Sequence, residues 1–493
     1  MKLWIAIWLN ERMDKTSQKL KFKFVWQPSN VIYRRATKFL LNIDAPFTSA
    51  ISIQKTRNAV FSKLKSSWLG IWFRNRHLKS YFLIRKFVLW LWKRGFYIYL
   101  FFFVRVINRD LGRPRHLYKL SNFAKKNKIQ IFSLNEAEII EADTPIVFPH
   151  SKQYCLSPDS DQYIFPEIVV ATIKNAKVYG ETNLVMVDDD VICHELHDFM
   201  RDYTSEELAG WILIDAKSNS IRWLVEDESS KPISIAATFV DACAANYAHW
   251  MTEVLPRIAL FCADEQFQDI PIVVNEGLHK NIMESLSFVV GSERQIILLP
   301  FGHALDIEQL YMISVTGYVP FGRRDNKLSG HSHGIFSPRA FEQLRDTMNE
   351  NIREMENEDW PEKIFLRRNS GVRKLVNSEE IETLLVADGF VIVEPEKLTF
   401  LQQLQLFKHA KTIVSSTGAA LASAVFCIPK TKVIVIMSIH EDMIYRYWYN
   451  MLHPLNINVG YVLGHTINSD QEMHSDFIVN TADVLSILKV MED

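Results

Sequence analysis

The clearest pattern in the sequence is an alternation of apolar and amphipathic segments between residues 363 and 438. Four short apolar runs, KIFLRR, FVIVEP, KTIVSS and TKVIVIMS, are rich in β-branched residues and typical of buried strands. The segments between them, SEEIETLLVAD, FLQQLQLFKHA and GAALASAVF, have helical spacing. Asn377 and Thr399 each stand three residues before a Glu or Gln, which predicts a capping box for the first two helices. Strands that alternate with helices predict βαβ units and a parallel sheet.

A second region with the same alternation precedes it, from residue 233 to residue 314. ISIAATF, IPIVV, RQIILLP and EQLYMIS are typical of strands. NYAHWMTEVLPRIALF and HKNIMESLSFVV are typical of helices, and Pro256 is expected to bend the first of them. Residues 130–230 carry shorter apolar runs separated by turn residues, which predict a β-rich segment. We therefore predict an α/β fold whose two α/β domains face a cleft.

Charge separates the N-terminal part of the chain from the rest. Residues 1–130 hold 28 Lys and Arg but only 4 Asp and Glu, whereas the remaining residues hold 28 and 53. We predict a basic, aromatic, helical arm over residues 1–125, which implies an anionic partner. An α/β domain with a β-rich start is predicted over residues 126–325, and a second α/β domain over residues 326–493.

The arm is apolar as well as basic. Its most apolar part, FVLWLWKRGFYIYLFFFV at residues 87–104, is interrupted by Lys93 and Arg94. A membrane-spanning helix needs about 20 mostly apolar residues. Aromatic residues interleaved with Lys and Arg favour instead an interfacial helix on an anionic membrane surface. The same composition also suits a nucleic-acid-binding tail, which is the alternative.

The cysteines and the first residues bear on the compartment. The five cysteines form no C-x-x-C pair and are expected to be reduced, buried thiols rather than zinc ligands. The start, MKLWIAIWLNER, has no A-x-A-like site, so a cleaved signal peptide is not expected. We predict a cytoplasmic protein that is peripheral on the inner face of the plasma membrane.

Polar and small residues follow the strands of the C-terminal region. In chain order they are Arg367, Arg368 and nearby Arg373, then Glu394, then Ser416, Thr417, Gly418 and Ala419. Right-handed crossovers bring such strand ends to one edge of a sheet. A helix N-terminus without bulky side chains binds phosphate, arginines bind a diphosphate, and a carboxylate accepts the hydroxyls of a ribose. The set predicts a nucleotide-diphosphate site. The alternative is that the small residues only allow close packing of helix on sheet.

The helix NYAHWMTEVLPR offers a candidate catalytic pair. His249 and Glu253 are four residues apart and share a face of the helix. A histidine that is held by a carboxylate can act as a general base. The alternative is a structural histidine beside a surface carboxylate. The pair could also be half of a metal site, but the spacing shows no third ligand.

Three further groups resemble metal sites. Asp188–Asp190 end an apolar run, as in the acidic motif of metal-dependent glycosyltransferases, but the VICHEL that follows favours an acidic hairpin turn. His194, Glu195 and His197 form H-E-x-H rather than the zinc motif H-E-x-x-H. His331 and His333 stand in a polar, Gly-flanked segment that is typical of a linker.

Two strings in the sequence resemble a known family. FLRRNSGVRKLVNSEEIETLLVADGFVIVEPEKLTFLQQLQLFKHAKTIVSSTGAALASAVFC and NYAHWMTEVLPR are similar, in this order, to the motifs of glycosyltransferase family 61 (the DUF563 proteins, capsular polysaccharide biosynthesis type). The resemblance covers roughly residues 140–480 and not the arm. It implies a GT-B-like architecture of two Rossmann-like domains and inverting transfer from a nucleotide sugar, usually a UDP-sugar.

The resemblance also implies roles for residues. Arg367, Arg368 and Glu394 fall where the family contacts the donor, and Gly418 and Ala419 where the helix that faces the diphosphate begins. His249 and Glu253 fall in the signature that lines the cleft from the other domain. Family members usually have a His at the position of Thr417, and a threonine cannot supply an imidazolium charge.

The leading hypothesis is an inverting glycosyltransferase that acts without a metal or other cofactor. The expected partners are a nucleotide-sugar donor, a surface or lipid-linked glycan acceptor and an anionic membrane surface; no nucleic acid is expected. One alternative is a non-catalytic nucleotide- or glycan-binding subunit of a polysaccharide assembly complex. Another is a metal-dependent transferase that uses Asp188–Asp190.

Overall fold

The computed structural model describes residues 113–158, 161–180, 182–198, 212–215, 219–223, 228–319, 334–352, 359–370, 372–440, 443, 445–467 and 475–492. The predicted arm is outside the described residues as far as residue 112. Within the described residues, no helix is both long and apolar enough to cross a lipid bilayer.

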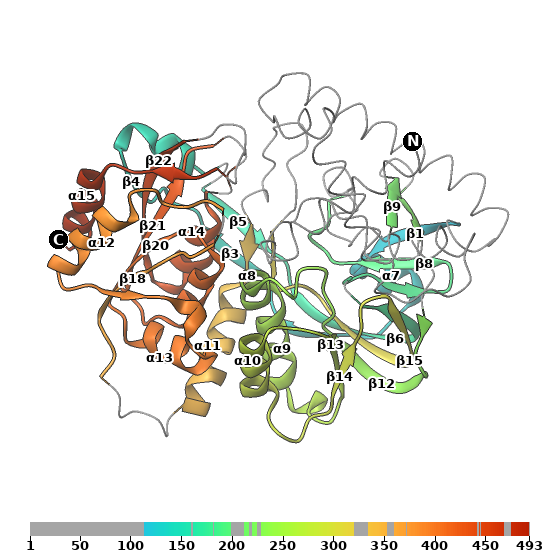
Figure 1. Cartoon of the computed structure of the whole chain (residues 1–493). Helices are drawn as coiled ribbons and strands as arrows, with labels where there is room; N and C mark the ends of the chain where they lie inside the picture. Colours follow the sequence, from blue (N-terminus) through green and yellow to red (C-terminus); the bar gives the residue numbers. More distant parts are fainter. Residues whose placement is uncertain are drawn as a thin grey trace, which may run out of the picture. The chain divides into compact units, whose positions relative to one another are not determined.

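The region from residue 233 to residue 313 forms the parallel part of a large mixed sheet (Figure 1). Its strands are β12 (Ile233–Thr238), β13 (Ile272–Asn275), β14 (Ile296–Leu299) and β15 (His303–Ile313). Their order across the sheet is β14-β13-β12-β15, and neighbouring strands are parallel. In chain order this is 3-2-1-4, so the direction of winding reverses between β12 and β15. The four strands predicted for this region are confirmed.

Antiparallel strands continue this sheet beyond β15, as the β-rich prediction for residues 130–230 implies. β15 pairs with β6 (Ile168–Tyr179), β6 with β7 (Val185–Val187), and β7 with β8 (Asp190–Cys193). The other members are β1 (Pro114–Lys119), β2 (Ile131–Asn135), β9 (Ile212–Asp215), β10 (Ser220–Trp223) and β11 (Glu228–Ser229). A separate ribbon joins β3 (Glu138–Glu141) to β5 (Gln162–Phe165). Helix α7 (Leu120–Asn127) follows β1, and the 3-10 helix η2 (His150–Leu156) precedes β5.

The helices between the parallel strands lie where the sequence places them. The predicted helix after β12 runs through α8 (Tyr247–His249), a π-helical turn η3 (Trp250–Val254) and α9 (Leu255–Ala263). Pro256 stands in the first turn of α9, directly after the π turn, so its missing N–H is tolerated there. The helices that follow are η4 (Glu265–Phe267) and α10 (Lys280–Val290).

The C-terminal region forms a second sheet of mainly parallel strands. They are β18 (Lys363–Leu366), β19 (Val391–Val393), β20 (Thr412–Ser416), β21 (Lys432–Ser438) and β22 (Asn458–Thr466). Their order is β19-β18-β20-β21-β22, all parallel, which in chain order is 2-1-3-4-5. β22 also pairs with two short strands, β4 (Ile146–Phe148) and β23 (Phe477–Ile478). β4 therefore belongs to this sheet although it lies more than 200 residues before β18.

Helices cover both faces of the second sheet (Figure 1). On one face α12 (Ser378–Ala387) and α15 (Thr481–Glu492) bury their apolar side chains against Phe365, Val414 and Ile434. The other face carries α11 (Pro338–Ile352), α13 (Phe400–His409), η6 (Ala419–Phe426) and α14 (Tyr447–Leu452). The remaining short elements are β16 (Gly317–Tyr318), β17 (Ile335–Phe336), η5 (Pro395–Lys397) and η7 (His453–Leu455). The α/β class predicted from the sequence is confirmed.

The two predicted capping boxes have different outcomes. The Thr399 hydroxyl accepts from the Gln402 N–H, and the Gln402 side chain accepts from the Thr399 N–H, so this box is confirmed. The prediction of a capping box at Asn377 is wrong. The Asn377 side chain bonds to the N–H and the carbonyl of Val479 instead, so a tertiary contact replaces the local cap.

Packing and polar contacts join the two sheet regions. One cluster of buried apolar side chains contains residues of both regions, among them Trp250 and Phe400. The Glu284 carboxylate of α10 accepts from the N–H groups of Phe400 and Leu401, at 3.0 and 3.3 Å, and so caps α13. α10 of the first region thus fixes the start of a helix in the second.

Candidate active site

The switch point of the second sheet lies between β18 and β20. In a parallel sheet of order 2-1-3-4-5, ligands bind outside the carboxyl ends of the strands at this point. Arg367 and Arg368 directly follow β18, while Ser416 ends β20 and Thr417 follows it. The two strand ends touch, because Arg368 Nη1 donates a hydrogen bond to the Thr417 carbonyl at 2.9 Å. The structure thus brings together residues that are 49 positions apart.

Gly418 makes this contact possible. A Cβ atom at this position would lie 2.5 Å from Arg368 Nη1. The φ angle of Gly418 is −176°, an extended conformation that any residue adopts, so the glycine is needed for space and not for backbone freedom. The absence of a side chain at Gly418 therefore leaves room for Arg368 beside the Thr417 carbonyl.

Arg368 and Arg373 form a positive pair at this edge. Burial and, to a smaller extent, the nearby charge of Arg373 together lower the pKa of Arg368 to about 9. Burial also lowers the pKa of Arg373, and its Nε is buried without a hydrogen bond. Neither guanidinium forms an ion pair within the described residues, and Arg368 Nε donates only to the Val372 carbonyl at 3.3 Å. An anion bound beside this pair would offset the energetic cost of burying the two charges and weaken the repulsion between them.

Arg367 is placed differently, because carboxylates already surround it. Its Nε donates to Glu382 Oε1 at 3.0 Å, its Nη2 to Glu382 Oε2, and its Nη1 to Glu394 Oε1 at 3.2 Å. The hydrogen bond with Glu382 is the main reason why the pKa of Arg367 is raised. Arg367 therefore fixes Glu394, which also pairs with Lys397. The sequence does not reveal Glu382 as a partner, since it is one of several acids on α12.

Hydrogen bonds also hold the residues after β20. Thr417 is 6% exposed, and its hydroxyl accepts from the Trp448 indole N–H at 3.0 Å. Ser416 is buried at the end of the strand, and Ala419 begins η6, a 3-10 helix with Gly418 at its N-cap. The Thr417 hydroxyl therefore faces Trp448 and does not cap this helix. Trp448 carries no signal in the sequence that connects it to this site.

His249 and Glu253 are in contact, as their spacing predicts. His249 Nδ1 lies 2.7 Å from Glu253 Oε1 across the π-helical turn. Burial alone would lower the pKa of His249, but the charge and the hydrogen bond of Glu253 outweigh burial, and the pKa is raised. The Nδ1 contact with Glu253 fixes the orientation of the imidazole ring.

The helix that carries this pair packs against the second region. The Tyr247 hydroxyl lies 2.8 Å from the Ser423 hydroxyl of η6, and the Thr252 hydroxyl lies 3.1 Å from that of Tyr447 of α14. η6 begins directly after Gly418. The His249–Glu253 pair and the arginine pair are thus attached to packed neighbouring elements.

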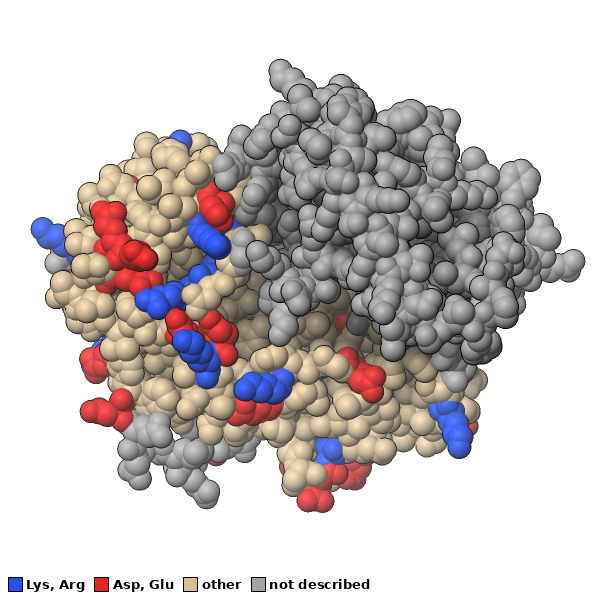
Figure 2. Space-filling view, viewed as in Figure 1, with Lys and Arg blue, Asp and Glu red and all other residues tan. Residues whose placement is uncertain are grey.

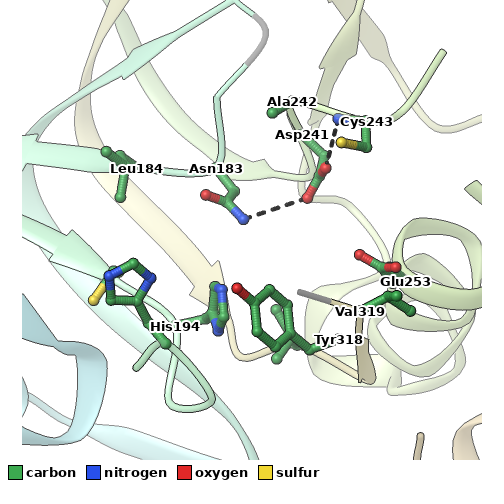
Figure 3. A pocket seen from close by; sticks show the side chains of 12 residues that line it. Asn183, Leu184, His194, Asp241, Ala242, Cys243, Glu253, Tyr318 and Val319 are labelled. Atoms are coloured by element: carbon green, nitrogen blue, oxygen red, sulfur yellow. Dashed lines mark hydrogen bonds between the residues drawn. The ribbon is translucent and has the colours of Figure 1, made fainter. Parts of the chain in front are cut away.

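A small polar cavity lies at the switch point of the first sheet (Figure 3). Asp241 and Cys243 come from the loop after β12, and Val315 and Tyr318 from the segment after β15. Glu253 closes it from the helix. Asp241 is a functional candidate that the sequence does not indicate, because its neighbours in the cavity are far apart along the chain.

Among the described residues, the groups that resemble metal sites do not assemble into one. Asp188 and Asp189 form the two-residue turn between β7 and β8, with Asp188 at φ 50°, so the predicted acidic hairpin is confirmed. Asp190 pairs with Lys126 at 2.8 Å, and Glu195 accepts from Ser121. Among the described residues, no three His, Cys, Asp or Glu side chains are grouped so that they could hold a metal ion. The segment with His331 and His333 is outside the described residues.

The family comparison covers the residues that carry this site. Residues 247–434 match the family model described as Glycosyltransferase 61. The match begins at the helix with His249 and extends past η6 into β21. No curated protein matches the chain. The resemblance inferred from the two sequence strings is confirmed for residues 247–434, which are similar to glycosyltransferase family 61.

Proposed function

We propose that the chain is an inverting glycosyltransferase that moves a sugar from a nucleotide-diphosphate donor, a UDP-sugar, to a hydroxyl of a surface or capsular glycan. The observation that carries the proposal is the arginine pair at the switch point of the second sheet. Arg368 and Arg373 have no acidic partner among the described residues and stand where parallel sheets bind nucleotides. A diphosphate supplies the two negative charges that this pair lacks.

The proposed architecture is GT-B-like. The domain of residues 326–493 holds the donor, and the domain of residues 126–325 holds the acceptor. Glu394 follows β19 and pairs with Arg367 and Lys397. In the proposal it accepts the ribose hydroxyls of the donor. The backbone from Ser416 to Ala419 provides the surface along which the diphosphate lies, with Arg368 beside it.

In the proposed reaction the acceptor hydroxyl attacks the anomeric carbon of the donor sugar. His249 takes the hydroxyl proton, and Glu253 stabilises the imidazolium that forms. The bond between the anomeric carbon and the phosphate oxygen breaks as the glycosidic bond forms. Arg368 and Arg373 stabilise the negative charge of the departing nucleoside diphosphate, so the proposed mechanism requires no metal.

The basic aromatic arm would place this reaction at a membrane. Residues 1–125 combine basic and aromatic side chains, a composition that favours an anionic lipid surface. We propose a cytoplasmic enzyme on the inner face of the plasma membrane whose acceptor is a lipid-linked or growing glycan.

The test is nucleotide release from a panel of UDP-sugars in the presence of glycan acceptors. The wild-type chain is expected to release UDP in an acceptor-dependent manner. His249→Ala is expected to abolish release and to keep the affinity for UDP, because the histidine acts on the acceptor. Normal turnover in His249→Ala would contradict the assignment of the base.

A second candidate is a non-catalytic binding subunit of a polysaccharide assembly complex. The observation that favours it is the Thr417 hydroxyl, which is bonded to Trp448 and adds no charge at the diphosphate. UDP binding without turnover on any acceptor of the panel would favour this candidate.

A further inference from the structure

The cavity at the switch point of the first sheet contains a carboxylate that the proposed reaction does not use. Asp241 stands three residues after β12, at the strand edge where sheets of this order bind ligands. Its side chain is directed into the cavity between Asn183 and Glu253 (Figure 3). Asp241 is only 6% exposed, so its charge has little contact with bulk water.

Neighbouring groups hold Asp241 in a fixed position. Asn275, at the end of β13, accepts from the Asp241 N–H at 3.0 Å and donates to its carbonyl at 2.9 Å. The Cys243 N–H donates to Oδ1 at 2.9 Å, and Asn183 Nδ2 lies 3.5 Å from Oδ2. An ionised carboxylate accepts about four hydrogen bonds, so Asp241 keeps acceptor capacity on the side of the cavity.

Neutralisation of Arg257 is the other role that Asp241 could have. Arg257 is 4% exposed, and its guanidinium lies over the Phe239 ring at 5.6 Å. Its Nε and Nη2 atoms form no hydrogen bond. The charge of Asp241 counteracts the effect of burial on the pKa of Arg257, but no ion pair within 4.0 Å joins the two groups. Asp241 therefore acts on Arg257 only at a distance. The orientation of Asp241 toward the cavity needs another reason.

We propose that this cavity receives one hydroxyl or hydroxymethyl group of the acceptor sugar, and that Asp241 accepts its hydrogen bond. The volume of about 30 Å³ exceeds the roughly 10–15 Å³ that one water needs, and it is far too small for a sugar ring. A single polar group therefore enters while the ring stays outside. The inference rests on the proposed function, since it takes the acceptor to be a glycan, and it makes Asp241 a determinant of acceptor specificity.

The test compares sugars that differ by one hydroxyl. The binding of methyl hexosides and their monodeoxy derivatives to the full chain is measured by calorimetry, with and without saturating UDP. In the wild type, one monodeoxy derivative is expected to bind at least about tenfold more weakly than its parent, because it leaves the buried carboxylate unpaired. In Asp241→Asn the parent and that derivative are expected to bind alike.

Two further variants keep the test decisive. Asp306→Asn changes a half-buried aspartate of β15 that pairs with Lys177 away from the cavity, and it should preserve the wild-type discrimination. Asn183→Ala is the second variant, to be used if Asp241→Asn fails to fold. It removes the side chain beside the Asp241 carboxylate and should reduce the discrimination between the parent hexoside and its derivative. The proposal is overturned if no hexoside binds, if every derivative binds like its parent, or if Asp241→Asn keeps the discrimination. A lack of UDP binding would contradict the nucleotide site instead, and the hexoside series without UDP would still decide the role of Asp241.

Discussion

Gly418→Ala tests whether the close approach of Arg368 to the backbone serves ligand binding. The new Cβ would lie 2.5 Å from Arg368 Nη1, whereas ordinary contacts begin at 3.4 Å. The guanidinium must therefore withdraw by about 0.9 Å. A withdrawal of that size away from the Thr417 carbonyl lengthens their 2.9 Å bond to about 3.8 Å, beyond the roughly 3.2 Å limit of a good hydrogen bond.

The cost is expected both in affinity and in stability. A hydrogen bond from the charged Arg368 to a phosphate oxygen contributes about 1.5–3 kcal/mol, so displacement of Arg368 should weaken UDP binding roughly ten- to hundredfold. Loss of the bond to the Thr417 carbonyl costs a similar amount of stability, while an alanine in an unstrained conformation stabilises a fold by about 0.4–1 kcal/mol. The free energy of unfolding should therefore fall by about 0.5–2.5 kcal/mol.

Calorimetry on a double-mutant cycle with Arg368→Met separates this mechanism from a general disturbance. In the Arg368→Met background, Gly418→Ala should have almost no further effect on the affinity for UDP, because the displaced group is already gone. Additive losses would show that the two residues act independently. Wild-type affinity in Gly418→Ala alone would refute the reasoning directly.

Two further predictions concern the catalytic pair and the junction between the two regions. The rate kcat/KM is expected to fall as the pH drops through the raised pKa of His249, since only the neutral imidazole accepts a proton. Glu253→Gln removes the charge that raises this pKa and leaves the burial that lowers it, so the acid limb of the pH profile should move to lower pH; an unmoved limb would contradict the role of the pair. Glu284→Gln is expected to lower the free energy of unfolding in urea by about 1 kcal/mol, because a charged cap at the start of α13 is lost. Glu276→Gln, an exposed control, should leave it unchanged, and equal values for both variants would contradict the capping role.

The parallel strands of both sheets could be predicted because each is a short apolar run with turn or helix signals on both sides. β12–β15 and β18–β21 all lie where the sequence indicates. The pairing of β4 with β22 could not be predicted, since strands that are more than 300 residues apart share no local signal. Asn377 shows a similar limit, because its distant partner Val479 outcompetes the local cap.

Some residues of the candidate site could likewise be predicted from the sequence, and others could not. The strand-end rule identifies Arg367, Arg368 and the residues near Gly418, because a parallel sheet gathers its carboxyl ends at one edge. The rule does not predict which arginine forms an ion pair with a carboxylate. In the structure Arg367 pairs with Glu382. The helical spacing predicts the contact of His249 with Glu253. Asp241 could not be found this way, since only the fold brings the segments after β12 and β15 together.

The most direct test of the central claim is the calorimetric titration of the full chain with UDP, with and without EDTA, in the wild type and in Arg368→Ala. We expect that UDP binds the wild type, that EDTA does not change the affinity, and that Arg368→Ala loses binding while its melting temperature stays close to that of the wild type. GDP and CMP are the matched comparisons, and UDP is expected to bind more tightly than either. Wild-type affinity in Arg368→Ala, or no binding of UDP to the wild type under either condition, would contradict a nucleotide-sugar site at the switch point of the second sheet.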